Sequence, residues 1–455
     1  MNDSIKIWRN FPCKRRAGKK ACDIIVSDSR RKVIVVSAPG KRYSDDIKVT
    51  DLLIKCAEAY IATGNASKEC DTVISRFADI GKDLGVSSSV MASIAGDIAG
   101  RLKLYTGDDK KFVDIMKAAG EDNCAKLIAG YLKSRGTDAR YINPGDAGLV
   151  LSNEFGNAQV LPESYKNLRA LRDIPGIVIF PGFFGYSCEG DIVTFPRGGS
   201  DITGSILAAA LDAELYENFT DVDCVYSVNP RIISNPHPIY ELTYREMREL
   251  SYAGFNVFHE EALVPVYNKG IPVRIKNTNN PNAPGTTIVK ERKNITRPVI
   301  GIANDDRFCC ININKYLMNR EIGFGRKVLK ILEDENLSYE HMPSGIDHIS
   351  IVLNQSQMKK ETEERITNRI KKELDVDEVS VMHNLALIML VGEGMSQTVG
   401  IAARATAAFA RVGVNIEMIN QGVSEISIMF GVKAEDSIKA VKSLYEEFFG
   451  SSCGE

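Results

Sequence analysis

A glycine-flanked aromatic pair near the middle of the chain is the first candidate for ligand binding. The segment PGFFGY (181–186) follows an apolar run and places a glycine on each side of Phe183 and Phe184. Because glycine has no Cβ atom, the backbone of such a turn can approach a ligand closely. We therefore expect the turn through Gly185 to form one wall of a pocket.

The next segment, FPRGGSDITGS (195–205), carries groups that bind anions. Arg197 can donate two parallel hydrogen bonds to a carboxylate or a phosphate, and the two following glycines, which include Gly199, can form a backbone cradle. Ser200 and Asp201 stand where a helix is expected to begin, so backbone N–H groups and the helix dipole would face the anion. Taken alone, S-D-x-T also fits a simple helix N-cap.

An acidic turn, TDVDCVYSVNPR (220–231), follows the next expected strand. Acidic turns at strand ends bind ribose hydroxyls or metal-bound phosphates. Two further segments, ELTYREMRELSYAGFNVFHEEAL (241–263) and IPVRIKNTNNPNAPGT (271–286), follow this turn in the chain. The combination indicates a phosphate-bearing ligand beside the anion site.

The elements that must position these residues alternate between strands and helices. KVIVVSAPG predicts a buried parallel strand, LLIKCAEAYIA a helix, and residues 66–135 a long helical region that stops at Gly136. DARYIN, LVLSN, AQVLP and IPGIVIFPGFFGY predict further strands, and SDITGSILAAALDAEL a helix. This order over about 290 residues indicates an α/β domain with a largely parallel sheet.

The character of the chain changes near residue 294. The polar stretch NTNNPNAPGTTIVKERKN predicts a boundary or linker, and a degenerate repeat follows it. Each copy reads as strand, glycine turn, helix and strand pair, and the copies end in HISIVLNQ and EISIMFGV. A repeat of about 75 residues is too long for a solenoid unit and suggests two small α+β domains. Coincidental similarity between ordinary α+β segments is the alternative.

Composition excludes several classes of protein. The chain has 455 residues, which suggests about three domains, and its net charge of −2 gives no general attraction to nucleic acid or to an anionic membrane. No apolar stretch reaches the roughly 20 residues of a membrane span, and the N-terminus lacks a signal-peptide core. The ten cysteines show no C-x-x-C and the five histidines no H-x-x-x-H pair, so we expect a reduced, cytoplasmic protein without a zinc site.

The motifs in this order resemble the aspartokinases of the amino-acid kinase family. Their G-F-x-G, G-R-G-G-S-D-x-T, T-D-V-D-G-x-Y-x-x-D-P-R, V-L-H and I-P-x-x-x-N-T blocks correspond to residues 182–185, 196–203, 220–231, 257–259 and 271–278. The two C-terminal repeats resemble the paired ACT domains with which these enzymes sense amino acids. The resemblance implies a three-layer αβα kinase domain with a mainly parallel sheet (1–293), followed by two ferredoxin-like α+β ACT domains (294–375 and 376–455).

The resemblance also implies roles for individual residues. Thr50, Glu121, the Phe183–Gly185 turn, Arg197, Gly199 and Ser200 would bind L-aspartate, with Glu121 on the α-ammonium group and Arg197 on the α-carboxylate. Lys6 and Asp201 would act in catalysis. The nucleotide side would consist of Thr220, Asp221, Tyr226, Arg231, Asn256 and Val257. From the residues alone, Glu121 also fits a solvated helix charge, Arg231 a structural partner of Asp221 or Asp223, and Tyr226 a core residue.

Three positions or segments depart from the family pattern. Asn229 stands where D-P-R has aspartate, and Asn256 where G-A-K-V-L-H has lysine, which removes a positive charge from the nucleotide side. The N-terminal K-F-G-G-T-S loop is replaced more fully, since only Lys6 of KIWRNFPCK matches it. Trp8 and Pro12 stand where small residues belong, and proline lacks the N–H donor that a phosphate-binding loop uses.

A compensated frameshift would account for the altered N-terminal loop. Codons can be chosen for residues 7–16 that, read one base later, encode Phe-Gly-Gly-Thr-Ser-Leu-Ala-Lys-Asp-Ala. The hypothesis is a shift, in the gene or in its sequencing, that returns to frame near residues 17–18. An intact mass that matches the printed sequence would exclude a sequencing error.

The implied reaction is ATP-dependent phosphorylation of the aspartate β-carboxylate with Mg²⁺ as the companion ion. No general base is required, because the carboxylate is already ionised at pH 7. The resemblance implies feedback control by lysine, with threonine as the alternative, and pairing of ACT domains in a homodimer or larger assembly. The effector would contact Met318, Gly323, Phe324, Gly325, Tyr339, Glu340 and Asp347, although ordinary turns and solvated acids fit these positions equally well.

Two other functions compete with this reading. One is an amino-acid sensor that keeps the ACT pair but has lost phosphoryl transfer through the altered N-terminal loop. The other is a kinase of the same family that acts on a different acid, against which the ACT pair and R-G-G-S-D weigh. We expect no appended homoserine dehydrogenase, because the sequence ends directly after the second repeat.

Overall fold

The structure is a computed structural model that describes residues 6–9, 15–255, 257–258, 260–422 and 426–450. By internal contacts the chain forms two compact units, which are described separately below. The first contains Met1–Val225, Ile239–Met247 and Asn256–Arg292, and the second contains Tyr226–Pro238, Arg248–Phe255 and Lys293–Glu455. The three domain ranges expected from the sequence stay a prediction.

The first unit is built on an eight-stranded sheet with the order β11-β13-β12-β8-β1-β2-β5-β3. The strands from β12 to β3 are parallel, whereas β13 runs antiparallel to β12. In chain order the strands are β1 (Lys6–Arg9), β2 (Arg31–Val36), β3 (Ala139–Tyr141), β5 (Ile177–Pro181), β8 (Leu215–Thr220), β11 (Glu241–Thr243), β12 (Val273–Asn277) and β13 (Thr286–Val289). The predicted parallel sheet is confirmed.

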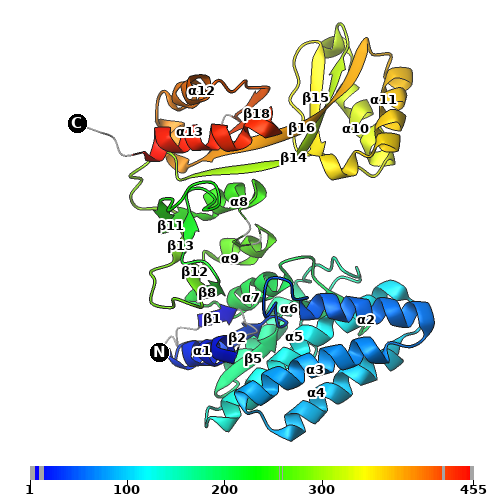
Figure 1. Cartoon of the computed structure of the whole chain (residues 1–455), viewed down its shortest axis with the longest axis vertical. Helices are drawn as coiled ribbons and strands as arrows, with labels where there is room; N and C mark the ends of the chain where they lie inside the picture. The colour runs from blue at the N-terminus through cyan, green and yellow to red at the C-terminus, as the bar shows by residue number, and fades with distance from the viewer. Residues whose placement is uncertain (1–5, 10–14, 256, 259, 423–425, 451–455) are drawn as a thin grey trace. The chain divides into compact units, whose positions relative to one another are not determined.

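Helices cover both faces of this sheet. On one face, Ile34 and Val36 of β2 belong to a core shared with α1 (Arg15–Val26), α2 (Val49–Thr63), α3 (Ser67–Leu84), α4 (Ser88–Arg101) and α5 (Asp109–Ser134). Helix α7 (Gly199–Ala210) packs on β1, β2 and β8 and is joined by α9 (Leu263–Lys269). Figure 1 shows α2, α3, α4 and α5 as a bundle beside the sheet. This is the three-layer αβα arrangement that the sequence predicts.

Strand β2 is joined to β8 across β1 by a buried ion pair. Arg31 at the start of β2 is 7% exposed, and its Nε lies 2.7 Å from the carboxylate of Glu217 on β8, which is 2% exposed. Buried charges of this kind are tolerated because each is paired. The pair fixes the spacing of the strands on which the candidate site depends.

A smaller three-stranded sheet carries the glycine-flanked turn of the first unit. It consists of β4 (Val150–Leu151), β6 (Phe184–Ser187) and β7 (Ile192–Thr194), and α6 (Glu163–Asn167) follows β4 in the chain. The predicted strand AQVLP contributes only an isolated bridge between Val160 and Leu151. Pro162, which cannot donate a ladder hydrogen bond, instead precedes α6.

The polar stretch expected to be a linker contains a strand. Thr286–Val289 forms β13, which pairs with β12 through a turn at Gly285. Gly285 has φ +76°, and a Cβ atom there would lie 2.2 Å from the Ile275 carbonyl oxygen, so only glycine fits. The prolines and asparagines correctly predicted a turn, but the TTIV segment after it is a strand of the sheet and not part of a linker.

The second unit contains a five-stranded antiparallel sheet with the order β15-β14-β16-β18-β17. Its strands are β14 (Gly301–Asn314), β15 (His348–Asn354), β16 (Glu378–Val391), β17 (Met418–Asn420) and β18 (Ser427–Lys433). Its helices are α8 (Tyr244–Tyr252), most of which lies in this unit, α10 (Phe324–Asp334), α11 (Lys360–Leu374), α12 (Ile401–Arg411) and α13 (Ser437–Phe449). Short strands β9 (Val225–Tyr226) and β10 (Pro238–Ile239) lie where the chain passes between units.

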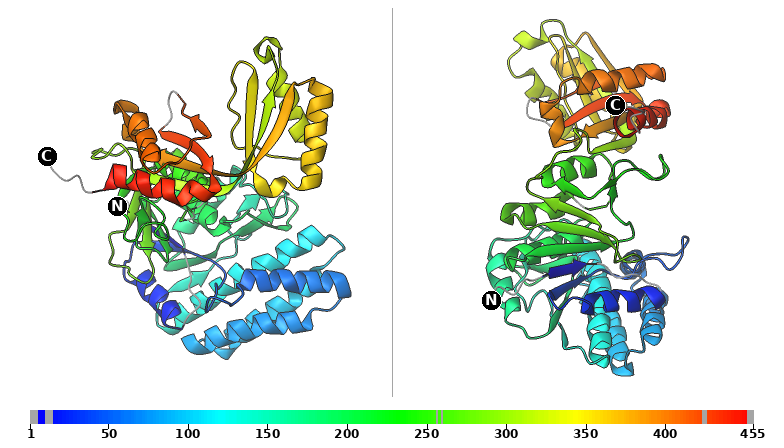
Figure 2. Two further views of the ribbon diagram at one scale, coloured as in Figure 1. Left: turned by 45° about the horizontal axis from the view of Figure 1, so that its top comes forward. Right: turned by 90° about the vertical axis from the view of Figure 1, so that its left-hand side faces the viewer.

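Two cores divide this sheet along its long strands. Ile311 and Ile313 of β14 pack with α10 and α11, whereas Ile302 of the same strand packs with α12 and α13. In Figure 2 helices α10 to α13 of this unit, coloured yellow to red, lie beside the sheet that contains the long strands β14 and β16. The arrangement confirms two α+β modules, and it adds that both use the same pair of long strands.

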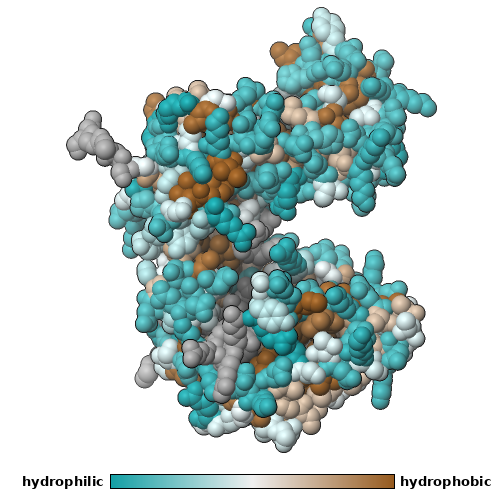
Figure 3. All heavy atoms as spheres, in the orientation of Figure 1, coloured by the Kyte–Doolittle hydropathy of each residue, from teal (hydrophilic) through white to brown (hydrophobic). Residues whose placement is uncertain are grey.

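Among the described helices, none combines the length and apolar character needed to cross a membrane. Hydrophilic side chains dominate the face of the molecule shown in Figure 3, and apolar residues form small patches between them.

Candidate active site

The candidate site of the first unit lies at the carboxyl ends of its parallel strands. Ser37 follows β2, Gly182 follows β5 and Asp221 follows β8; β8 and β2 flank β1 in the sheet, and β5 lies next to β2. In open α/β sheets, ligands bind outside the carboxyl ends of the strands, where the strand order reverses. Residues predicted from separate sequence segments therefore meet at one edge.

The glycine-flanked turn packs closely against the start of α7. A Cβ atom on Gly182 would lie 2.7 Å from the Ser200 Cβ atom, and one on Gly199 would lie 2.6 Å from the Phe183 ring. The backbone N–H of Phe183 donates to the Thr203 hydroxyl at 3.0 Å. Phe183 adopts φ +75°, which is unusual for a residue with a side chain. The turn is therefore held in one strained conformation by α7.

Helix α7 begins beside this turn. Gly198, with φ +85°, is its N-cap, and Ser200 and Asp201 in its first turn are each 5% exposed. The Asp201 carboxylate accepts a hydrogen bond from the Asn218 side chain of β8 at 2.5 Å. Asn218 was not predicted from the sequence, although a buried polar residue within the strand LYENFT was a usable signal.

Arg197 lies just before this helix and is exposed. No residue in the described parts of the chain forms an ion pair or hydrogen bond with its guanidinium. An exposed arginine beside a helix N-terminus suits the capture of an anion from solvent.

A buried carboxylate supports the segment that leads to Arg197. Asp114 of α5 is 1% exposed and accepts the backbone N–H groups of Thr194 and Gly156, each at 2.8 Å. The Lys117 ammonium lies 2.7 Å from Asp114 and 5.8 Å from the centre of the Phe183 ring. These contacts link α5 to the turn at Phe183. Neither Asp114 nor Lys117 was predicted from the sequence.

Glu121 lies one helical turn after Lys117 and is 5% exposed, so the structure gives it a buried rather than a solvated environment. The next residue, Asp122, is paired with Arg101 at 2.6 Å and with Lys126 at 2.9 Å. It also accepts the Tyr141 hydroxyl. Burial, and secondarily the Asp122 charge, raises the pKa of Tyr141. This network fixes the middle of α5.

The remaining substrate-side residues differ in exposure. Thr50 is half-buried and is the second residue of α2, after the loop that follows β2. Phe184 is fully buried, and its ring packs against Tyr186. Gly185 lies in β6, where a Cβ atom would lie 2.9 Å from the Leu151 side chain.

The predicted nucleotide residues fall in both units. Thr220 ends β8, its hydroxyl donates to Asp221 at 3.1 Å, and Asp221 is exposed. Val257 is half-buried in the first unit, and Asn256 lies outside the described residues. Tyr226 and Arg231 belong to the second unit, where Arg231 is exposed and forms no ion pair among the described residues. For Lys6 the structure describes the backbone in β1 only.

The predicted effector residues lie around α10 in the second unit. Gly323 is the N-cap of α10 with φ +76°, and Gly325 follows in its first turn. Met318 and Phe324 are buried in the neighbouring core, whereas Tyr339 is exposed. The Asp347 carboxylate accepts the Leu317 backbone N–H at 2.8 Å, and Glu340 accepts the Tyr252 hydroxyl.

Comparisons with known proteins agree with this architecture. Residues 14–277 match the amino acid kinase family, and residues 388–448 match the ACT domain. Aspartokinase 3 of Bacillus subtilis is 58% identical over 430 residues, which cover 94% of this chain and 95% of that protein.

Solved structures of aspartate kinases share the fold of this chain. The aspartate kinase of Clostridium acetobutylicum superposes with a TM-score of 0.83 at 37% identity, covering 98% of this chain and all of that one. Aspartokinase III of E. coli, in complex with aspartate and ADP, has the same fold, with a TM-score of 0.78 at 23% identity and coverage of 97% and 99%. The family predicted from the motifs is confirmed: this chain belongs to the aspartokinases of the amino acid kinase family.

Proposed function

We propose that this chain transfers the γ-phosphoryl group of ATP to the β-carboxylate of L-aspartate, giving 4-phospho-L-aspartate and ADP. The observation that carries the proposal is the 58% identity to a Bacillus subtilis aspartokinase over nearly the full length of both proteins. The site geometry supports it, because the G-F-x-G turn and the start of α7 lie together at the carboxyl edge of the sheet.

The acceptor side needs orientation rather than proton removal. The β-carboxylate is ionised at pH 7, so the residues have to place it in line with the terminal phosphate. Arg197 would hold the α-carboxylate and Glu121 the α-ammonium group, while Ser200 and the Phe183 turn close the pocket. Asn218 keeps the Asp201 carboxylate in place at the first turn of α7.

Charge neutralisation would come from backbone donors and from the nucleotide's own cation. The N-terminus of α7 presents N–H groups to developing negative charge. Within the described residues, no group of three or more His, Cys, Asp or Glu side chains could hold a metal ion. This donor set fits Mg²⁺ that is bound mainly by ATP phosphates and water, which needs few protein ligands. Bound Mg²⁺ supplies positive charge to the phosphates.

The proposed activity is tested by ATP turnover with purified protein. We expect acyl-phosphate formation, trapped as the hydroxamate, with L-aspartate and not with L-glutamate or acetate as acceptor. Mg²⁺ should be required. Turnover with another acid but not with aspartate would assign a different kinase of the same family.

An altered N-terminal loop favours one alternative, an amino-acid sensor with impaired catalysis. The amino acid kinase match begins at residue 14, after β1 and the segment that departs from K-F-G-G-T-S. Effector binding without phosphoryl transfer would identify such a sensor.

We further propose that L-lysine regulates the enzyme through the segment around α10. Its N-terminus can receive a carboxylate, and Glu340 and Asp347 can meet ammonium groups. An E. coli aspartokinase III structure is described as a complex with lysine and aspartate in the T-state, and it shares the fold. The proposed homodimer would also cover exposed apolar side chains in this segment, namely Tyr316, Ile322 and Ile346.

Lysine inhibition should weaken in a Glu340→Gln variant. We expect the half-inhibitory lysine concentration to rise by about fivefold or more, at the lower end of typical allosteric coupling, while activity without lysine is unchanged. Glu333→Gln, an exposed acid of α10, serves as the control. Equal inhibition of both variants by lysine would contradict the assignment, and inhibition by threonine alone would identify the other effector.

A further inference from the structure

The loop that leads from β2 to the substrate side of the site is anchored by an arginine from a distant helix. Residues 37–48 connect β2 to α2 without regular structure, and half of these residues are exposed. Thr50, the proposed aspartate contact, comes directly after this loop in the first turn of α2. A long exposed connection has a defined conformation only where specific contacts hold it.

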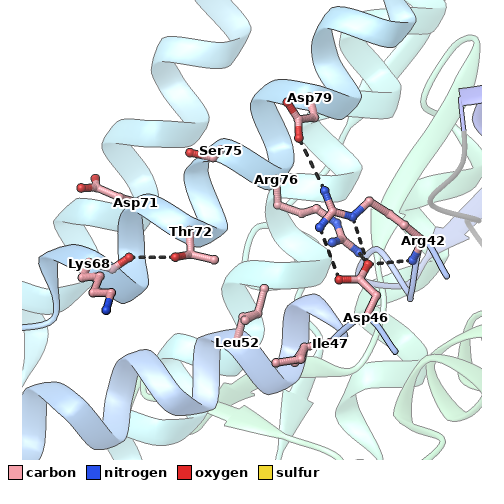
Figure 4. Close-up of a pocket in the computed structure, with 10 residues that line it drawn as sticks. All are labelled: Arg42, Asp46, Ile47, Leu52, Lys68, Asp71, Thr72, Ser75, Arg76 and Asp79. Atoms are coloured by element: carbon pink, nitrogen blue, oxygen red, sulfur yellow. Dashed lines mark hydrogen bonds and ion pairs between the residues drawn. The ribbon is translucent and has the colours of Figure 1, made fainter. Parts of the chain in front are cut away.

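Arg76 supplies these contacts from α3. Its side chain is 3% exposed, and its Nη2 atom donates to the Gly40 carbonyl oxygen at 2.9 Å and lies 2.5 Å from an Asp46 carboxylate oxygen. Figure 4 shows Arg76 and Arg42 converging on Asp46 at one end of a pocket between the loop, α2 and α3. One guanidinium therefore holds two points of the loop.

Asp46 also forms hydrogen bonds within the loop. Its carboxylate accepts the backbone N–H of Arg42 at 2.8 Å and the Arg42 Nε at 3.0 Å. The hydrogen bond from Arg76, followed by that from Arg42, holds the pKa of Asp46 well below its usual range, so the contact persists at any working pH. Asp79 on α3 also faces the pair and lies 3.6 Å from Arg42.

The other described hydrogen bonds of this loop stay within it or at its junction with α2. Val49 donates to the Pro39 carbonyl, Asp46 to the Tyr43 carbonyl, and the Lys41 ammonium to the Ser44 carbonyl. In the described part of the chain, the exposed Arg42–Asp79 pair is the remaining ionic link from the loop to another element, and exposed pairs contribute little. Arg76 is thus the main anchor.

We propose that Arg76 is a positioning residue for aspartate binding, which fixes the loop at 40–46 and thereby the place of Thr50 at the site. This inference rests on the proposed function. It predicts an effect on the acceptor and not on the nucleotide, because the anchored loop leads to the acceptor side. Misplacing a substrate-binding group by about 1 Å can cost up to about 100-fold in rate.

The test compares Arg76→Met and Arg76→Lys with Arg42→Ala. Arg42 binds the same carboxylate and is half-buried, but its loss leaves the Arg76 contacts with Gly40 and Asp46 intact. We expect Arg76→Met to raise KM for aspartate by about tenfold, with KM for ATP nearly unchanged, and to lower the thermal midpoint because Asp46 loses its buried partner. Arg76→Lys should recover part of the loss, and Arg42→Ala should stay within about twofold of wild type.

Hydrogen exchange gives a readout that does not depend on activity. Peptides covering residues 38–52 should exchange faster in Arg76→Met than in wild type or Arg42→Ala, while peptides from β5 and α7 remain unchanged. Unaltered loop exchange, or equal increases in both KM values, would overturn the proposal. A wild-type protein that does not phosphorylate aspartate would reject the proposed function, and the exchange data alone would then decide whether Arg76 anchors the loop.

Discussion

Replacing Arg197 with alanine is expected to raise KM for L-aspartate by about 100-fold. The proposed contact is a charge-assisted, bidentate hydrogen bond to the α-carboxylate, and its loss should cost about 3 kcal/mol, or about two powers of ten in affinity. KM for ATP should change little, because Arg197 is assigned to the acceptor. Stability should also change little, because Arg197 is exposed.

Steady-state kinetics with both substrates measure this effect. Arg197→Lys should fall between wild type and Arg197→Ala, since lysine keeps the charge but not the planar fork. Arg169→Ala, an exposed arginine elsewhere in the first unit, is the matched control and should behave like wild type. Normal aspartate affinity in Arg197→Ala would eliminate the proposed role of this residue.

Restoring the family loop at the N-terminus should increase turnover by about 100-fold. The combined variant I7F/W8G/R9G/N10T/F11S introduces the glycines and hydroxyls that the printed sequence lacks after Lys6. Loss of preorganised donors to a transferring group typically costs 100- to 1000-fold in kcat, so their return should have a comparable effect. The backbone of β1 lies between β2 and β8 with its carboxyl end at the site edge, where a phosphate-binding loop is useful.

The control for this experiment is the same variant with Lys6→Met. Lys6 is the proposed catalytic lysine, so its removal should cancel the gain in turnover. Intact-mass measurement of the starting protein belongs with the experiment, because it tests whether the protein has the mass of the printed sequence. Equal kcat values for the printed and restored sequences would show that the altered loop does not limit catalysis.

The sequence motifs predicted the local geometry at the glycine-flanked turn and at the start of α7. Gly182 and Gly199 were recognisable because no residue with a Cβ atom fits between the turn and α7. The start of α7 was recognisable from its turn-type residues. Strand periodicity did not reveal which way Phe184 faces, and the structure buries this side chain against Tyr186.

Residues that act through long-range contacts could not be predicted. Nothing in the sequence around Arg76 indicates that its guanidinium reaches Gly40 and Asp46, since that contact exists only when α3 packs beside the loop. Asp114 is similar, because its two backbone donors come from segments 42 and 80 residues away. The shared strands β14 and β16 were also missed, because each repeat reads as a separate module.

The central claim is that the first unit binds L-aspartate with its α-carboxylate on Arg197 and its β-carboxylate facing the nucleotide. A crystal structure with L-aspartate and a non-hydrolysable ATP analogue tests it most directly. The account predicts both guanidinium Nη groups within hydrogen-bond distance of the α-carboxylate and the terminal phosphate aligned with the β-carboxylate. Aspartate bound away from Arg197 would contradict it.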